Sequence, residues 1–429
     1  MSKHEIKKIS GRMVFDSRGL PTIEAEVYLN DGSMGKAIAP SGASKGINEA
    51  LEKRDFKKKF LGLSVDKNIF DIKGKINEAL SGQSVLNQKN LDNILIKIDG
   101  TTNKSVLGGN TTIAVSMATL KTAAQFKRKD LWQYLDSSKK KLLLPIPQVQ
   151  IFGGGAHANN QISIQDFLII PNGAKSFIEA MEWVFVIFKN TLEELKKEKK
   201  FSGFADEGGY WPNFKRNENI LAFLSKMIER SGFKLLKDVS IALDIAANNF
   251  YKKPFYNFNK SKKITVDELL DIYVSWFKKF PIISIEDPFS EYDILYYKKL
   301  KNKAPKYVQI IGDDLVVTNK QLIAKAVNKK SINSVLIKPN QIGTISETID
   351  SLNLTRKLGL VDIISARSGE TEDVTIADLS VGWQTNQIKV GSFSRTERLA
   401  KWNQCLRIGE KLNNNFKMHK NSILGWNKL

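Results

Sequence analysis

Three carboxylates stand at the ends of short apolar runs in the second half of the chain. Asp244 closes VSIALD, Glu286 closes PIISIE, and Asp313 follows VQIIG. If these runs are neighbouring strands, the acids meet at one edge and repel one another unless a cation neutralises them. The chain has a single cysteine and no histidine cluster, so an oxygen-only ligand set favours Mg²⁺ over zinc. We therefore predict a magnesium site formed by these acids, with Asp287 and Asp314 as supporting or helix-capping groups.

Three cations and a serine belong to the next apolar runs. Lys338 comes directly after SVLI, Arg367 and Ser368 follow VDIISA, and Lys389 lies within NQIKVGS. A lysine inside a buried strand is costly to keep charged, and neighbouring cations would lower its pKa toward that of a base. A Schiff-base role for Lys338 stays open. The other groups suit a phosphate, so we expect a small phosphorylated acid held on Mg²⁺ while Lys338 takes a proton.

Three loops add further candidates. Glu207, in SGFADEGGYWPN, could protonate a leaving group from the opposite side, or it could be an ordinary surface acid. His157, in the glycine-rich GGGAHANN, could bind substrate, although no second histidine at metal-site spacing accompanies it. SGASKG, which contains Ser44, is expected to be a mobile loop, and it lacks the spacing of a phosphate-binding P-loop.

The spacing of the strand-end groups indicates which elements position them. From Asp244 to Lys389 the six groups lie 42, 27, 25, 29 and 22 residues apart, and a helical pattern fills each gap. Such a series of βα units, with ions at the carboxyl ends of buried runs, is typical of a (β/α) barrel whose site lies at that end. The apolar run at 162–171 is expected to be a further strand. We predict that the barrel occupies residues 141–429.

Residues 1–140 are predicted to form a separate, small α+β domain. Asn30-Asp31-Gly32 stands between two alternating runs, a pattern that predicts a β-hairpin. Helical patterns follow at 66–80, 88–98, 110–126 and 129–136. The segment KLLLPIP, with two prolines, is the expected linker to the barrel.

The composition is that of a globular protein. The 429 residues include 66 basic and 45 acidic side chains, a net charge of +21. The lysines form short scattered runs, so we interpret them as solvated faces that steer anionic substrates, and nucleic-acid binding has no support beyond this charge. Cys405 is the single cysteine, which excludes an internal disulfide and indicates a cytoplasmic compartment. The sequence has neither the apolar core of a signal peptide nor an apolar run of membrane-spanning length, so no membrane insertion is expected.

From FDSRGLPT (15–22) to RTERLAKWNQCLRI (395–408), the sequence resembles the enolase family. The motifs that carry this resemblance are SGASKG, IDGTTNK, GGAHANN, DEGGYWPN, SIEDPF, GDDLVVTN, IKPNQIGT, RSGETED, TIADL and QIKVGS. The resemblance implies a small N-terminal α+β domain followed by a TIM-type (β/α)8 barrel with irregular first units. It also implies a hydro-lyase, phosphopyruvate hydratase, that reversibly dehydrates 2-phosphoglycerate to phosphoenolpyruvate in glycolysis and gluconeogenesis.

The same resemblance assigns roles to residues of this chain. Lys338 would be the base that takes the C2 proton, and Glu207 the acid that assists loss of the C3 hydroxyl. One Mg²⁺ would be held tightly by Asp244, Glu286 and Asp313, and a second, arriving with substrate, would be held with the help of Ser44. Substrate contacts would come from Gln165, His157, Arg367, Ser368 and Lys389. Since family members form dimers or octamers, a homo-oligomer is expected, mainly in the cytoplasm with a secondary cell-surface or secreted pool.

Several positions depart from the family pattern. Ala366 stands where the family has a histidine, and Asp166 where it has a glutamate that is one methylene longer. Both would belong to the polar network around Glu207, so their loss is expected to slow the reaction while metal and substrate still bind. The alternative is an enolase-fold paralogue with weak or no catalysis that acts mainly as a binding or scaffold protein. Further departures are Leu20, Lys45, Phe152, Asn248 and Asn249.

Overall fold

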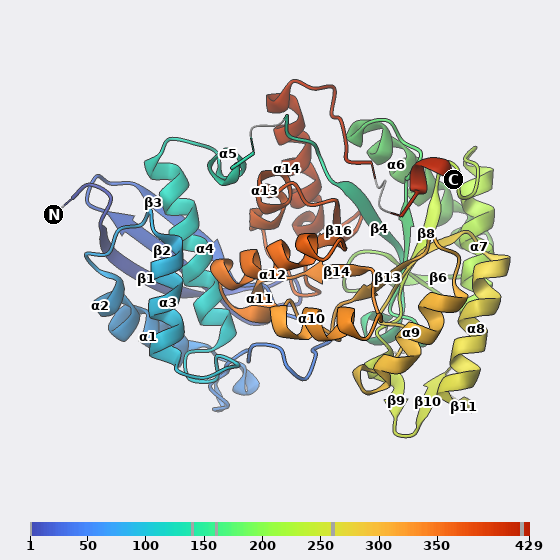
Figure 1. Cartoon of the computed structure of the whole chain (residues 1–429), viewed down its shortest axis with the longest axis horizontal. Coiled ribbons are helices and arrows are strands. Elements are labelled where there is room, and N and C mark those ends of the chain that lie inside the picture. The colour runs from blue at the N-terminus through green and yellow to red at the C-terminus, as the bar shows by residue number, and fades with distance from the viewer. Residues whose placement is uncertain (1, 139–140, 159–161, 259–261, 421–423) are drawn as a thin grey trace.

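The computed structural model of the chain describes residues 2–138, 141–158, 162–258, 262–420 and 424–429, with the side chains of 156, 157, 262 and 427 outside the description. A small N-terminal domain lies beside a large barrel, and the two ends of the chain lie on opposite sides of the molecule (Figure 1). This arrangement confirms the predicted fold class.

The N-terminal domain is a three-stranded antiparallel sheet covered by helices. Strands β1 (Ile6–Phe15), β2 (Pro21–Leu29) and β3 (Met34–Ile38) pair in that order, and the predicted turn joins β2 to β3. Helix α4 (Gly109–Phe126) packs on β2 and β3, and barrel helices contact it as well. Because it is covered by both domains, α4 is buried along most of its length.

The other helical patterns of this domain are also present, as α1 (Asp66–Asp71), a π-helical segment η2 (Ile72–Ile76), α2 (Asn77–Leu80), α3 (Gln88–Asp99) and α5 (Leu131–Leu135). Helix α5 is shorter than its pattern, because a capping box starts it at Asp130 and Asp136 already has an extended backbone. Helix α3 ends at Gly100, whose left-handed conformation suits glycine.

Among the described residues, eight strands close into the barrel: β4 (Ile146–Gly153), β5 (Asp166–Ile170), β8 (Ser240–Asp244), β12 (Ile282–Glu286), β13 (Gln309–Gly312), β14 (Ser334–Ile337), β15 (Val361–Ser365) and β16 (Gln387–Ser392). Pairing of β16 with β4 completes the ring. All six strands predicted from the apolar runs are present, and their carboxyl ends form one mouth.

Strand β5 runs antiparallel to both of its neighbours, β4 and β8. Its first residue, Asp166, therefore lies at the barrel mouth, opposite Gly153 and Asp244. The strand is shorter than the predicted 162–171, and Gln165 precedes it. Because β5 runs in the opposite direction, it begins at the barrel mouth, where its neighbours β4 and β8 end.

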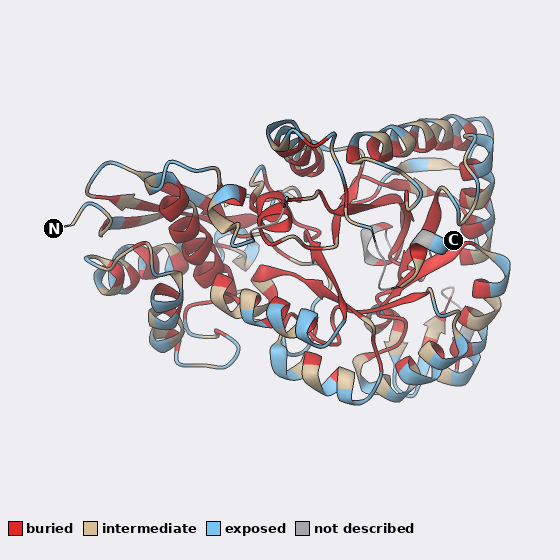
Figure 2. Ribbon diagram, turned by 45° about the horizontal axis from the view of Figure 1, so that its top comes forward, coloured by how far each residue is buried: buried red, intermediate tan, exposed pale blue. Residues whose placement is uncertain are grey.

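Helices surround the barrel and turn their exposed faces outward, while the strands are buried (Figure 2). They are α6 (Phe177–Lys197), α7 (Asn217–Arg230), α8 (Val266–Lys279), α9 (Ile294–Lys303), α10 (Lys320–Asn328), α11 (Pro339–Ile342), α12 (Ile345–Lys357), α13 (Thr375–Gly382) and α14 (Thr396–Leu412). Among the helices that the structure describes, none is long and apolar enough to cross a lipid bilayer.

Five short strands lie outside the predicted βα rhythm. Strands β6 (Phe201–Phe204) and β7 (Tyr210–Pro212) form a hairpin on either side of the Glu207 loop. Between β8 and α8, three more strands form an antiparallel meander: β9 (Tyr251–Lys252), β10 (Phe255–Phe258) and β11 (Lys262–Ile264). The gap after Asp244 is the longest of the series because it contains this meander as well as α8.

The last residues of the chain close the end of the barrel opposite the mouth. Trp426 is only 4% exposed and packs in a small apolar cluster with Ile146, Ile170 and Ile283. Its indole Nε1 donates a hydrogen bond of 2.9 Å to the Tyr307 carbonyl. The C-terminal segment is therefore part of the barrel core.

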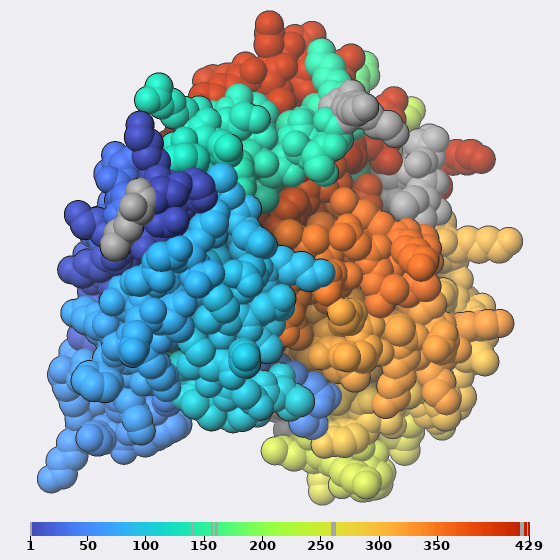
Figure 3. Space-filling view, turned by 60° about the vertical axis from the view of Figure 1, so that its left-hand side comes forward, coloured from blue at the N-terminus to red at the C-terminus, as the bar shows by residue number. Residues whose placement is uncertain are grey.

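The two domains share a continuous contact surface, where the N-terminal domain lies against the barrel helices (Figure 3). Ion pairs cross it: among them, Lys104 Nζ lies 3.0 Å from Glu347 Oε1, and Lys121 Nζ lies 2.8 Å from Asp373 Oδ2. The loop that contains Ser44 also crosses from the N-terminal domain to the barrel mouth.

Candidate active site

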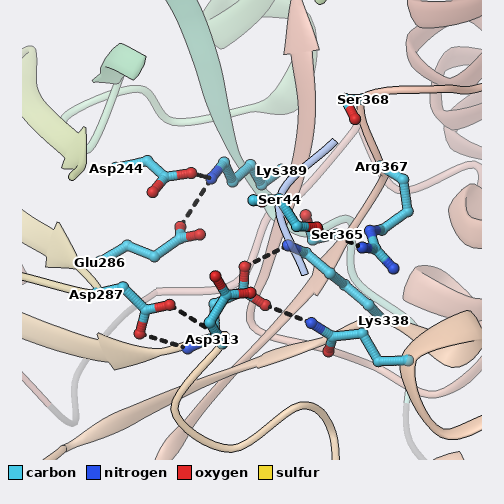
Figure 4. Close-up of polar contacts among 12 residues, drawn as sticks. Ser44, Asp244, Glu286, Asp287, Asp313, Lys338, Ser365, Arg367, Ser368 and Lys389 are labelled. Carbon is cyan, nitrogen blue, oxygen red and sulfur yellow. Dashed lines mark hydrogen bonds and ion pairs between the residues drawn. The ribbon is translucent and has the colours of Figure 1, made fainter. Parts of the chain in front are cut away.

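The six strand-end groups meet at the barrel mouth, as the sequence predicted (Figure 4). Each comes from a different strand or from the residues directly after it, and all are buried: Asp244, Glu286, Asp313, Lys338, Arg367 and Lys389. Three anions and three cations therefore share one enclosed site, where their interactions are only weakly screened by water.

Lysines neutralise the three acids. Lys389 Nζ lies 2.7 Å from Asp244 Oδ2 and 2.8 Å from Glu286 Oε2. Lys338 Nζ donates to Asp313 Oδ2, and the Gln341 amide donates to the other oxygen of Asp313 at 2.9 Å. Burial, together with the neighbouring Asp244 carboxylate, raises the pKa of Glu286 well above its ordinary value.

The donor set fits a hard divalent cation. Glu286 Oε1 is buried and has no hydrogen-bond partner among the described residues, so one carboxylate oxygen is available as a ligand. Oxygens of Asp287, Asp313 and Asp314 also lie within 4.8 Å of one another. Asp287, however, accepts the backbone N–H groups of Asp313 and Asp314 at 3.1 and 2.6 Å, which orients the turn after β13. Oxygen ligands of this kind suit Mg²⁺ or Ca²⁺ better than softer metals.

The pKa of Lys338 differs from the sequence-based expectation. Burial has the largest effect and lowers it, and Arg367 and Lys389 lower it too, but the carboxylates of Asp313 and Glu286 raise it, so the pKa lies above its ordinary value. The neighbouring cations lower the pKa as predicted, but the expected net lowering is wrong for this state of the molecule, because the Asp313 carboxylate touches the ammonium directly. Lys338 is therefore protonated while Asp313 has no other cation.

Glu207 is a buried residue, and the interpretation of an ordinary surface acid is wrong. It lines the same pocket as Lys338, Gln165 and Ala366. The backbone N–H of Ser392 donates to the Glu207 carbonyl at 3.0 Å, and this bond fixes the loop against β16. Close packing also explains Gly391, since a Cβ there would lie 3.1 Å from Glu207 Oε2.

Gln165 and Asp166 lie beside the acids through the reversed strand. Gln165 Nε2 donates to Asp244 Oδ2 at 3.1 Å, and Asn249 Nδ2 donates to Gln165 Oε1 at 3.2 Å. Asp166 accepts a hydrogen bond from the Gln150 amide, whose oxygen in turn accepts the Gly209 N–H at 2.8 Å. The chain around Glu207 is thus linked to Asp166 through Gln150.

The loop with Ser44 lies over the mouth and contacts the residues after β15. Arg367 Nη2 donates to the Ser44 carbonyl at 3.2 Å, and the Ala43 N–H donates to Ser368 Oγ at 2.6 Å. Arg367 Nη1 also contacts Glu49 Oε1 at 2.7 Å and Asn340 Oδ1 at 2.8 Å. Burial lowers the pKa of Arg367, but the Glu49 carboxylate more than offsets this and raises it.

Sequence reasoning missed Glu49, Asn340 and Gln341 as neighbours of the site. Asn340 and Gln341 directly follow Lys338 on α11, so their place in the chain was an available signal. Glu49 lies 318 residues from Arg367 and could be found only from the three-dimensional structure.

The two main departures lie where the resemblance placed them. Ala366 lines the pocket with Glu207, and its N–H donates to the Lys389 carbonyl at 2.8 Å. Phe152, by contrast, is core and packs against Tyr210 and Phe223. The side chain of His157 lies outside the part of the chain that the structure describes, so its predicted substrate contact stays a prediction.

Comparison with known proteins agrees with this geometry. Residues 6–135 match the family model "Enolase, N-terminal domain", and residues 141–425 match "Enolase, C-terminal TIM barrel domain". A protein of Ehrlichia canis (strain Jake) named "Enolase" is 44% identical over 413 residues, which cover 96% of this chain and 98% of that protein. The chain belongs to the enolase family.

Proposed function

We propose that Lys338 and Glu207 are the base and the acid of the reaction at this barrel mouth. The reaction follows from the family: the chain is a hydro-lyase that interconverts 2-phosphoglycerate and phosphoenolpyruvate in glycolysis. One observation carries the assignment of residues. Both side chains line one pocket of buried residues, together with Asp244, Arg367 and Lys389.

The chemistry explains why the mouth combines these groups. Loss of the C2 proton, which lies next to an ionised carboxylate, adds negative charge to a group that is already an anion. Lys338 would accept that proton, while Glu207 would donate a proton to the departing C3 hydroxyl, which leaves as water. Exclusion of water by the loop over the mouth strengthens each of these electrostatic interactions.

The family uses metal ions, and we propose that Asp244, Glu286 and Asp313 hold one Mg²⁺ tightly. The unpartnered oxygen of Glu286 supports this choice. Asp313 also belongs to a group of close carboxylate oxygens, but its partners there are Asp287 and Asp314. Ser44, in the loop over the mouth, would help to hold a second Mg²⁺ that arrives with substrate. When bound, Mg²⁺ supplies positive charge where the substrate carboxylate becomes more negative.

Occupation of the Asp313 carboxylate by a cation would also activate Lys338. Asp313 raises the pKa of Lys338 most, and Glu286 raises it as well. A ligand on that carboxylate removes the effect, while burial and the cations Arg367 and Lys389 continue to lower the pKa. Lys338 would then give up its proton and serve as a base.

The substrate is a small phosphorylated acid, and we propose that the remaining groups bind it. Arg367, Ser368 and Lys389 supply one guanidinium, one hydroxyl and one ammonium to its anionic groups. Gln165 would contact it from the start of β5, and His157 would approach from the neighbouring loop.

A direct assay tests this proposal. The purified protein should form phosphoenolpyruvate from 2-phosphoglycerate in the presence of Mg²⁺, and a chelator should stop the reaction. Lys338→Ala and Glu207→Gln should each lower kcat by about a hundredfold or more while the circular dichroism spectrum stays that of the folded protein. A folded Lys338→Ala variant with unchanged kcat would show that another group is the base.

We also propose an oligomeric state, a location in the cell and a domain boundary. We infer a homo-oligomer (dimer or octamer), a mainly cytoplasmic location, and a domain boundary between residues 140 and 141. The scaffold alternative is not favoured, because the family match extends over nearly the whole chain and the site residues are assembled in one pocket.

A further inference from the structure

We propose that Glu49 is a positioning residue: it holds the Arg367 guanidinium for the anionic group of the substrate and couples closure of the loop to substrate binding. The inference rests on the proposed function, in which Arg367 contacts substrate. We call residues 41–49 the lid, because they lie over the mouth and contact the segment after β15.

The contact between Glu49 and Arg367 is a buried ion pair between the domains. The side chains are 7% and 3% exposed, and Glu49 Oε1 lies 2.7 Å from Arg367 Nη1. Glu49 Oε2 is buried and has no hydrogen-bond partner among the described residues. Arg367 is therefore the one cation that neutralises Glu49 within the described part of the chain, and the two charges stabilise each other.

Glu49 contacts Arg367 but does not line the pocket, whereas Arg367, Gly42, Ala43 and Ser44 do. Its contact is with Nη1, while Nη2 contacts the Ser44 carbonyl. A carboxylate outside the pocket lining can hold the guanidinium without occupying the pocket, which favours a positioning role over competition with substrate.

Arg367 also defines the closed position of the lid. Its Nη2 donates to the Ser44 carbonyl, as Figure 4 shows, and the neighbouring Ser368 accepts from the Ala43 N–H. Gly42 lies so close to the guanidinium that an added Cβ would be 1.8 Å from Arg367 Nη2. The lid therefore holds the guanidinium at two atoms: Glu49 contacts Nη1, and the lid backbone contacts Nη2.

This arrangement links two events. Closure of the lid orients Arg367 for the substrate. Binding of substrate to Arg367 in turn keeps the guanidinium in the position that contacts the closed lid. Because such coupling is reciprocal, weakening the lid contact must weaken substrate binding and reduce the effect of substrate on the lid.

The test measures KM and kcat separately in a graded series. Glu49→Gln keeps an acceptor without charge, and Glu49→Ala removes both. KM for 2-phosphoglycerate should rise in the order wild type, Glu49→Gln, Glu49→Ala, to about tenfold or more for alanine, with a smaller change in kcat. A lower KM would mean that Glu49 competes with substrate, and an unchanged KM in Glu49→Ala would show no role; either result overturns the inference.

The matched control is Glu347→Gln, which removes the carboxylate of another interdomain ion pair, with Lys104, neither residue of which belongs to the lid. Its KM should match that of the wild type. Arg367→Ala distinguishes failure of the proposed substrate role of Arg367 from failure of the positioning role of Glu49. If its KM is unchanged, the proposed substrate role of Arg367 fails; if its KM rises but that of Glu49→Ala does not, only the positioning role fails.

A second readout follows lid closure without turnover. Lys45 lies in the lid, whose backbone is hydrogen-bonded to Arg367 and Ser368 in the closed state and must leave them to enter a protease, so trypsin cleavage there reports an open lid. Mg²⁺ with phosphoenolpyruvate should slow cleavage of the wild type strongly. The ratio of rates without and with these ligands should fall in Glu49→Ala and stay unchanged in Glu347→Gln; an unchanged ratio in Glu49→Ala would contradict the coupling.

Discussion

At the scale of single residues, the mouth is a set of charges that neutralise one another before any ligand enters. Lys389 contacts two acids, Lys338 contacts Asp313, and Arg367 contacts Glu49. Removal of one partner from such a set leaves an uncompensated buried charge, which is costly. We therefore expect that a ligand must replace these contacts with others of similar strength, which would favour anions that bind together with a cation.

The types of these residues could be predicted from the sequence, but their partners could not. A charged residue at the end of an apolar run indicates a strand-end site, as Asp244 and Lys338 do. The direction of the pKa shift of Lys338 depends instead on which side chain touches it, and Asp313 is on the preceding strand. Pairings of this kind are properties of the packed molecule.

Ala366 gives the first prediction at this scale. It lines the pocket with Glu207, and the resemblance described above implies an imidazole at this position. Ala366→His should raise kcat by about tenfold, because a second polar group near the acid would support the leaving hydroxyl. Ala366→Asn adds bulk and polarity without an imidazole and should not produce this gain. If Ala366→His has the wild-type rate, other residues already compensate for alanine.

At the scale of elements, the reversed strand β5 decides the shape of the site. Its sequence predicts a buried strand, but the apolar pattern contains no information about direction. The direction follows from pairing with β4 and β8, and it delivers Gln165 and Asp166 to the mouth. The meander β9–β11 was missed for a related reason: its strands are only two, four and three residues long, which is too short to show an alternating pattern.

The lid provides the second prediction. Gly42→Ala should raise KM by about tenfold or more, because the new Cβ and Arg367 Nη2 cannot occupy the same space and either the lid or the guanidinium must move. Steady-state kinetics with 2-phosphoglycerate would measure this. Gly74→Ala is the control, since nothing lies within 4 Å of a Cβ added there. Equal KM values for the two variants would contradict a lid that is held this closely.

The C-terminal segment provides the third prediction. Trp426→Ala should lower the free energy of unfolding by about 3–5 kcal/mol, the usual cost of emptying a buried aromatic site. Trp426→Phe keeps most of the apolar volume and loses the hydrogen bond to Tyr307, so its loss should be smaller. Urea denaturation would measure both. A negligible effect of Trp426→Ala would mean that the segment does not stabilise the barrel.

At the scale of the whole molecule, charge and burial act through different residues. The net charge of +21 belongs mostly to lysines spread over the helical surface, where it favours the approach of anionic substrates without specifying a site. Outside the mouth, the partly buried His419 has a consequence for the stability of the entire fold.

His419 gives the last prediction. Its Nε2 is buried with no hydrogen-bond partner among the described residues, and burial lowers the pKa of the imidazole to about 4 from an ordinary 6.5. Arg356 lowers it further and Asp362 partly opposes this. Between these two pKa values the unfolded chain binds a proton that the folded protein does not, so folding stability falls as the pH drops through 6.5 toward 4.

His419→Gln removes that proton uptake. Between pH 7 and pH 5, the free energy of unfolding should fall in both proteins. The fall should be smaller in the variant by on the order of 1–2 kcal/mol, because glutamine does not titrate. Chemical denaturation at several pH values would measure the difference, and the carboxylates that titrate in both proteins cancel in the comparison. Parallel pH profiles for the two proteins would show that His419 is protonated in the folded state as readily as in the unfolded chain, and that its burial does not contribute to the acid sensitivity of the molecule.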